Sequence, residues 1–133
     1  MARVRTIVCG TLALMVAGAG TWAVAQAAAP AGDPVKGKAV FAICSGCHVL
    51  TGASFAGPPL AGVVGRKAGT AKGFDYSKPL MASGIVWGDQ SLDRFLSDPS
   101  TAVPGTAMFS TVPDAQDRAD VIAYLKTVPA PAP

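Results

Sequence analysis

The sequence predicts an all-α fold with a single domain. Three stretches combine a residue that can cap a helix with apolar residues at helical spacing, and they begin at or after Asp33, Asp89 and Asp114. No segment alternates convincingly between polar and apolar residues, as a half-buried strand would. The chain has 133 residues, which is a length for one domain rather than two.

The first 27 residues differ from the rest and predict a secretory signal peptide. Arg3 and Arg5 precede an apolar run, IVCGTLALMVAGAGTWAVAQA, which offers leader peptidase a cleavage site after Ala25 or Ala27. The run is almost long enough to be an uncleaved membrane anchor, but its glycines and its small-residue exit weaken that alternative. Cys9 lies too early for a lipoprotein signal, so we expect it to leave with the leader.

Export has consequences for location and charge. We expect a periplasmic protein without stable membrane insertion, in which residues 28–32 form a short linker and 33–128 the domain. So small a domain would gain stability from a bound group. Arg3 and Arg5 are two of the 11 basic residues, so nine remain against eight aspartates. A formal charge of about +1 argues against nucleic acid as a partner.

The first helix is predicted from its start signal. Asp33 can cap it and Pro34 suits its first position, so the helix would run toward the cysteines that follow. Phe41 and Ile43 would give this segment apolar anchors.

The second and last helices follow from the same two signals. Asp89 can cap the second, which Asp98 and Pro99 end, and its apolar residues recur at i, i+3 and i+4: Leu92, Phe95 and Leu96. The last helix opens near Asp114 and ends before Pro129, and one apolar side holds Val121, Ile122, Leu125 and Val128. Residues 129–133, PAPAP, are expected to form a stiff, solvated tail.

The stretch CSGCH, residues 44–48, holds most of the soft metal ligands that follow the leader. Two cysteines in an exported chain would by default form a disulfide. A thioredoxin-like CxxC needs a preceding strand, whereas GDPVKGKAVFAI looks helical. A zinc site needs four ligands, and Cys44, Cys47 and the single histidine, His48, supply three. The spacing C-x-x-C-H favours covalent attachment of one haem c.

The spacing of these residues explains the chemistry. Side chains three residues apart on a helical turn share one face, so Cys44 and Cys47 can reach the two vinyl groups of one haem. His48 follows directly, which allows its imidazole to ligate the iron from one side. The motif does not reveal the other axial ligand, which decides between electron transfer and the binding of small molecules.

Methionine is the natural candidate for that ligand, because His48 is the only histidine. Met81 lies in a short helical piece after Ser77 that Gly84 ends, and a methionine at such a position usually fills a core. Met108 lies in VPGTAMFSTVP, between two helical patterns, where a loop can bring it to the haem face opposite the histidine. We therefore predict His48 and Met108 as the iron ligands.

The sequence also resembles a known family, the small class I cytochromes c. Seven segments carry the resemblance, in the family's order and with closely similar spacing over residues 32–128: GDPVKGKAVF, CSGCH, GPPLAGVVGRKAG, KGFDYS, SGIVW, VPGTAMF and IAYLK. Mitochondrial and bacterial photosynthetic-type carriers look most similar. The resemblance implies helices wrapped around one covalently bound haem, and a close crossing of the first and last helices at Gly37, beside Phe41 and Tyr124.

The resemblance implies roles for further side chains. Pro58 matches the proline whose carbonyl accepts a hydrogen bond from the ligating imidazole. Four residues match those that hold the haem propionates: Arg66, Tyr76, Trp87 and Thr106. Taken alone, the same residue types also fit ordinary uses, namely a turn for Pro58, the core for Trp87 and a surface cation for Arg66.

The chain also departs from the family. Phe95 stands where relatives often have a tyrosine, and Leu80 replaces a polar residue, so the methionine side of the haem should be drier. Relatives with a ring of lysines around the exposed haem edge have basic residues where this chain has Ile43, Ser100, Thr101 and Ala107. The identity of the family's partners therefore does not carry over.

The predicted function is one-electron Fe(II)/Fe(III) transfer by a monomer between membrane or periplasmic redox proteins of a respiratory or photosynthetic chain. No catalytic residue is assigned. Two other classes stay open. One is a haem enzyme, either the haem subunit of a periplasmic dehydrogenase or a peroxidase-like protein whose Met108 dissociates easily. The other is a gas-binding sensor, whose helix-bundle members carry CxxCH near the C-terminus.

We predict that Met108 ligation persists to unusually alkaline pH. In this family a deprotonated lysine of the methionine loop can replace the sulfur, but no lysine occurs from Ser97 to Val112. The nearest in sequence are Lys72, Lys78 and Lys126, all outside the loop. A pH titration of the oxidised protein, following the sulfur-to-iron charge-transfer band beside a relative with loop lysines, measures the difference. Loss of both bands at one pH would contradict the explanation.

Overall fold

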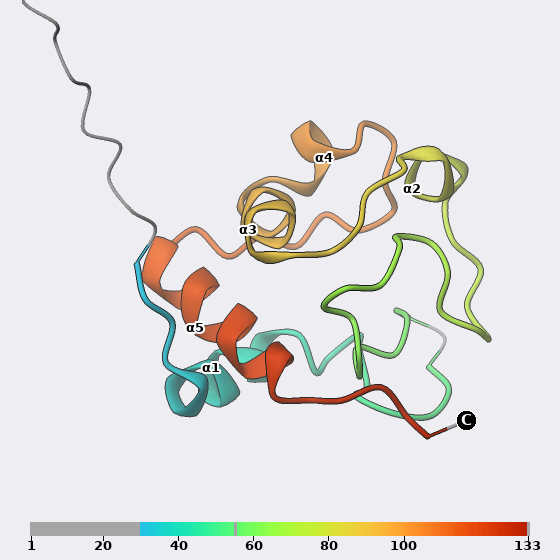
Figure 1. Ribbon diagram of the computed structural model, residues 1–133. Helices are drawn as coiled ribbons and strands as arrows, with labels where there is room; N and C mark the ends of the chain where they lie inside the picture. Colours follow the sequence, from blue (N-terminus) through green and yellow to red (C-terminus); the bar gives the residue numbers. More distant parts are fainter. Residues whose placement is uncertain (1–29, 55, 133) are drawn as a thin grey trace, which may run out of the picture.

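The computed structural model describes residues 30–54 and 56–132, so the predicted leader lies outside the described residues. Secondary structure there is helical (Figure 1), with η1 a 3-10 helix: α1 (Pro34–Val40), η1 (Phe41–Ile43), α2 (Lys78–Ala82), α3 (Asp89–Ser97), α4 (Pro99–Ala102) and α5 (Ala115–Lys126). The only β pairing among these residues is one isolated bridge, between Lys67 and Val86. The all-α prediction is confirmed. None of these described helices is long and apolar enough to cross a bilayer.

Helix α1 begins where the sequence predicts. Asp33 Oδ1 accepts hydrogen bonds from the backbone N–H groups of Val35, at 2.8 Å, and Lys36, at 3.4 Å. The 3-10 helix η1 continues directly from α1 and is closed by a bond from the N–H of Cys44 to the carbonyl of Phe41, at 2.9 Å. The two helices therefore deliver the CSGCH residues in a fixed position.

Helix α1 crosses α5 so closely at Gly37 that no side chain fits there. A Cβ at position 37 would lie 1.9 Å from the carbonyl oxygen of Asp120 and 2.9 Å from the Cβ of Tyr124. Beside the crossing, the Phe41 and Tyr124 rings pack with their centroids 5.5 Å apart. Figure 1 shows the two helices side by side. The crossing implied by the family resemblance is present.

The start of α3 differs from the prediction by one residue. Gly88, not Asp89, is the N-cap, and its N–H donates to Ser91 Oγ at 2.8 Å. Asp89 contributes its charge to the first turn instead. Asp98 ends α3 as predicted and also caps α4, which was not predicted, by accepting from the N–H of Thr101 at 3.0 Å. The apolar residues of α3 are buried as predicted: Leu92, Phe95 and Leu96.

Helix α5 begins as predicted but ends before its last apolar residue. Asp114 Oδ1 accepts from the N–H of Asp117 at 2.9 Å, and the buried residues include Val121, Ile122 and Leu125. Val128 lies beyond the end of the helix. Its carbonyl accepts a hydrogen bond from the N–H of Gly62, at 3.0 Å, and this bond directs the chain away from the helix. Residues 129–132 are exposed, yet Ala130 lies against Gly62, so the tail is not wholly solvated.

Asp120 is a buried carboxylate on α5 that the helical pattern did not single out. Its Oδ1 accepts from the N–H of Asp33 at 2.7 Å and from Gln116 Nε2 at 2.8 Å, and Gln116 also donates to the carbonyl of Ala31. The bond from Asp33, the bond from Gln116 and the charge of Lys36 lower the pKa of Asp120, while burial opposes them. These bonds fix the segment before α1 to α5.

Gly37→Ala is expected to destabilise the haem-loaded protein by about 3 kcal/mol, because the new methyl would push α1 away from the Asp120 carbonyl. Urea denaturation followed by circular dichroism measures the loss. Lys38→Ala, at an exposed position of the same helix, is the matched control and should change the free energy of unfolding by less than about 0.5 kcal/mol. Equal losses would show that the crossing has room for a side chain.

Asp120 should contribute to acid sensitivity. Its folded-state pKa lies below the unfolded one, so its stabilisation is complete above the ordinary carboxyl range and is lost as the pH falls below about 4. Asp120→Asn should therefore flatten the acid limb of a plot of unfolding free energy against pH. Asp75→Asn, an exposed position outside this network, serves as the control. An unchanged slope in Asp120→Asn would contradict the assignment.

Candidate functional site

The CSGCH residues form one helical turn after η1. The N–H groups of Cys47 and His48 both donate to the carbonyl of Cys44, at 3.1 and 2.9 Å. Cys44 is half-buried, which raises the pKa of its thiol, and Cys47 is exposed. The two sulfurs are not joined by a disulfide. Within the described ranges no cluster of three or more His, Cys, Asp or Glu side chains could hold a metal ion, so the zinc alternative has no ligand set there.

The imidazole of His48 is fixed by a single backbone acceptor. Its Nδ1 lies 2.8 Å from the carbonyl oxygen of Pro58. Because a carbonyl can only accept, Nδ1 carries the proton and Nε2 keeps its lone pair for a metal. The structure therefore brings together His48 and Pro58 in the arrangement that the family resemblance implies.

Gly57 allows this arrangement. It is buried, and a Cβ there would lie 2.7 Å from His48 Cε1 and 2.8 Å from Nδ1. Any side chain at this position would displace the ring from its acceptor. Ser54 Oγ donates to the carbonyl of Cys47 at 2.9 Å. Both loop contacts hold the motif turn in place.

The two methionines occupy different surroundings. Met108 lies half-buried against the core in the irregular segment between α4 and α5, and its N–H lies 3.4 Å from Thr106 Oγ1. Met81 lies in α2 with 47% of its surface exposed, so the expectation that it fills the core is wrong. The backbone and Cγ of Met81 lie close to Gly69.

Arg66 is a half-buried cation that braces the loop after Pro58. Its Nη2 donates to the carbonyl of Pro59 at 2.8 Å and its Nη1 to the carbonyl of Ala61 at 3.0 Å. Its own carbonyl accepts from the N–H of Trp87 at 2.9 Å. Trp87 is buried, with its ring centroid 5.0 Å from that of Phe95. Arg66 and Trp87 are thus joined through the backbone.

Tyr76 and Ser77 precede α2. Burial raises the pKa of Tyr76, and a backbone hydrogen bond at Ala71 and the charge of Arg66 act in the opposite direction. Ser77 is the N-cap of α2, but its side chain makes no capping bond. Among the described residues its Oγ is the single buried side-chain oxygen or nitrogen without a hydrogen-bond partner. A buried hydroxyl left unpaired by the protein suits a polar group of a ligand.

These residues fit a covalently bound haem. The turn supplies two thiols and an imidazole with a free Nε2, and Ser77 supplies a hydroxyl suited to a carboxylate. Ser77 was not among the predicted site residues. A serine ahead of Lys-Pro is explained in sequence as an ordinary helix cap, and only its burial without a partner suggests another use. Among the described residues no hydrogen bond joins His48 to Met108, so their pairing stays a prediction.

Comparisons with known proteins agree on one family. A family model described as Cytochrome c matches residues 34–129. Cytochrome c of Tetrahymena pyriformis is 52% identical over 101 residues, which cover 74% of this chain and 92% of that protein. Cytochrome c2 of Rhodomicrobium vannielii is 46% identical over 116 residues, which cover 85% and 91%. The solved structure of cytochrome cH from Methylobacterium extorquens has 44% identity and a TM-score of 0.69, covering 72% and 99%.

The matched residues include every part of the candidate site. Residues 34–129 run from α1 through the CSGCH turn and the Met108 segment to the end of α5. The chain therefore belongs to the class I cytochrome c family, whose members carry one covalently attached haem c, and Cys44 and Cys47 fit its attachment motif.

Proposed function

We propose that this protein is a periplasmic one-electron carrier whose haem iron is ligated by His48 and Met108. Relatives named cytochrome c and cytochrome c2 support electron transfer as the activity. The leader predicted at residues 1–27 supports export. When bound, haem c supplies an iron that cycles between Fe(II) and Fe(III).

The single observation that carries the proposal is the 2.8 Å contact between His48 Nδ1 and the Pro58 carbonyl. It directs Nε2 to act as the ligand, fixes the plane of the ring and increases the electron donation of the imidazole. Gly57 keeps the ring in that plane, because it leaves no side chain to displace it. A ligand held this rigidly needs little rearrangement when the charge of the metal changes.

Met108 is proposed as the second ligand. Met108 is half-buried and lies in an irregular segment, where no helix constrains the direction of its side chain. Met81, by contrast, lies in helix α2 and is exposed. A neutral thioether favours the ferrous state relative to anionic ligands, which supports a comparatively high reduction potential. Phe95 on α3 is buried and carries no hydroxyl, which supports an apolar environment on the methionine side of the haem.

The haem propionates are proposed to be held by donors from three loops. These candidates are Arg66, Tyr76, Trp87 and Thr106, together with the unpartnered Ser77. Buried carboxylates require donors and positive charge, and this group offers hydroxyls, an indole N–H and one guanidinium.

The proposed partners are membrane or periplasmic redox proteins that dock without a ring of lysines. The positions where such rings occur hold exposed uncharged residues: Ile43, Ser100, Thr101 and Ala107. Phe109, next to Met108, is 84% exposed and adds an aromatic ring to this surface. An uncharged face suits brief apolar contact more than long-range electrostatic steering.

The ligand assignment is tested by replacing each methionine in the haem-loaded protein. Met108→Ala should abolish the sulfur-to-iron charge-transfer band, lower the reduction potential and create peroxidase activity, because the iron would gain an open position. Met81→Ala is the matched control and should leave the band unchanged. A band lost in Met81→Ala and kept in Met108→Ala would reverse the assignment.

A further inference from the structure

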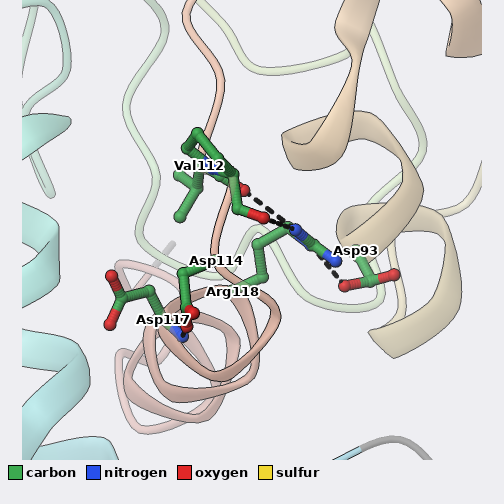
Figure 2. Close-up of polar contacts among 6 residues, drawn as sticks. Asp93, Val112, Asp114, Asp117 and Arg118 are labelled. Atoms are coloured by element: carbon green, nitrogen blue, oxygen red, sulfur yellow. Dashed lines mark hydrogen bonds and ion pairs between the residues drawn. The ribbon is translucent and has the colours of Figure 1, made fainter.

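Arg118 of α5 joins three parts of the fold. Its Nε donates to Asp93 Oδ1 on α3 at 2.6 Å, and its Nη1 donates to the carbonyls of Val112, at 3.0 Å, and Pro113, at 2.8 Å. Figure 2 shows the guanidinium reaching from α5 between the α3 carboxylate and the chain at Val112. Only 11% of the Arg118 side chain is exposed, against 49% for Asp93. Arg118 is therefore the more buried member of this ion pair.

The two carbonyls lie at the end of the segment that carries Met108. Val112 is buried, and its N–H donates to the carbonyl of Leu96 on α3 at 2.8 Å. Residues 109–111 are exposed and make no hydrogen bond with any other described residue. The first fixed point after Met108 is therefore Val112, held by α3 through its N–H and by Arg118 through its carbonyl.

The start of the same segment is held differently. The N–H of Val103 donates to the carbonyl of Pro99 at 2.8 Å, and that of Thr106 donates to the carbonyl of Val103 at 3.0 Å. These local bonds belong to α4 and the turn after it. Only the downstream end depends on a side chain from another helix, and that side chain is Arg118.

We propose that Arg118 is a positioning residue for the Met108 sulfur and that Asp93 orients it. The inference rests on the proposed ligation by Met108. Arg118 acts through the carbonyls of Val112 and Pro113, which it ties to α5 while Asp93 ties the guanidinium to α3. The planar fork of an arginine can serve the carboxylate and the carbonyls together, whereas a lysine ammonium cannot match that geometry. Weakening these contacts of the guanidinium would raise the fraction of molecules in which the Met108 sulfur has moved away from the iron.

Imidazole is a suitable probe, because it binds oxidised haem iron only where the methionine sulfur has moved away. Titration of the oxidised haem-loaded protein should show that Arg118→Lys tightens imidazole binding about tenfold and Asp93→Asn about threefold. The double substitution should equal Arg118→Lys alone, because Asp93 acts through the arginine. Should Arg118→Lys fail to fold, Asp93→Asn, which changes a half-exposed carboxylate, carries the test.

The matched control is the other ion pair between the same helices. Lys126 Nζ lies 2.6 Å from Asp89 Oδ2, so this pair also links α5 to α3, but it bonds no carbonyl of the Met108 segment. Lys126→Gln should leave imidazole affinity within about twofold of the parent protein. An equal shift in Lys126→Gln, or a shift below about twofold in both Arg118→Lys and Asp93→Asn, would overturn the inference.

Met108→Ala, measured in parallel, separates this inference from the proposed function. If Met108→Ala keeps the sulfur-to-iron band, the ligation itself is refuted and the inference falls with it. If Met108→Ala loses the band while the Arg118 and Asp93 variants bind imidazole as the parent does, ligation stands and only the positioning role is refuted.

Discussion

The backbone contact between α1 and α5 at Gly37 governs the arrangement of the rest of the molecule. It joins the two ends of the domain at a distance that admits no side chain. Helix α1 leads through η1 to the turn that holds Cys44, and α5 carries Arg118. Helices transmit position rigidly along their length, so this one crossing places the haem-attachment turn and the support of the Met108 segment relative to each other. The residues concerned lie far apart in the sequence.

Irregular loops make up most of the chain between the CSGCH turn and α3, and side chains rather than a sheet satisfy many of their carbonyls. His48 Nδ1 donates to the carbonyl of Pro58, and the guanidinium of Arg66 donates to the carbonyls of Pro59 and Ala61. Arg118 does the same for the segment after Met108. Buried carbonyls need donors, and a long basic side chain can supply several at once. Arg66 and Arg118 therefore hold the backbone of these loops in place, and the surface around the exposed Phe109 is uncharged.

The elements that the sequence predicted depend on neighbours within a few residues. The Asp33 cap and the buried face of α3 followed from local spacing, and so did the end of that helix at Asp98. The attachment motif was equally local, since CxxCH lies in five consecutive residues. Because the chain has a single histidine, composition alone excluded a second histidine as an iron ligand. The cap of α3 was misplaced by one residue because Asp89 is already helical, while Gly88 before it has extended backbone and donates its N–H to Ser91 Oγ.

Sequence alone therefore determined the three longest helices, the covalent attachment and the candidate ligands, because each depends on residues close together in the chain or on composition. Tertiary structure decided which polar groups are buried and what they meet. It placed the carboxylate of Asp120 beneath the start of α1, left the Ser77 hydroxyl without a protein partner and exposed Met81. It also paired Arg118 with Asp93, two residues that look like solvated surface charges in sequence. Burial and pairing depend on how separate segments pack, and no local pattern encodes the distance between them.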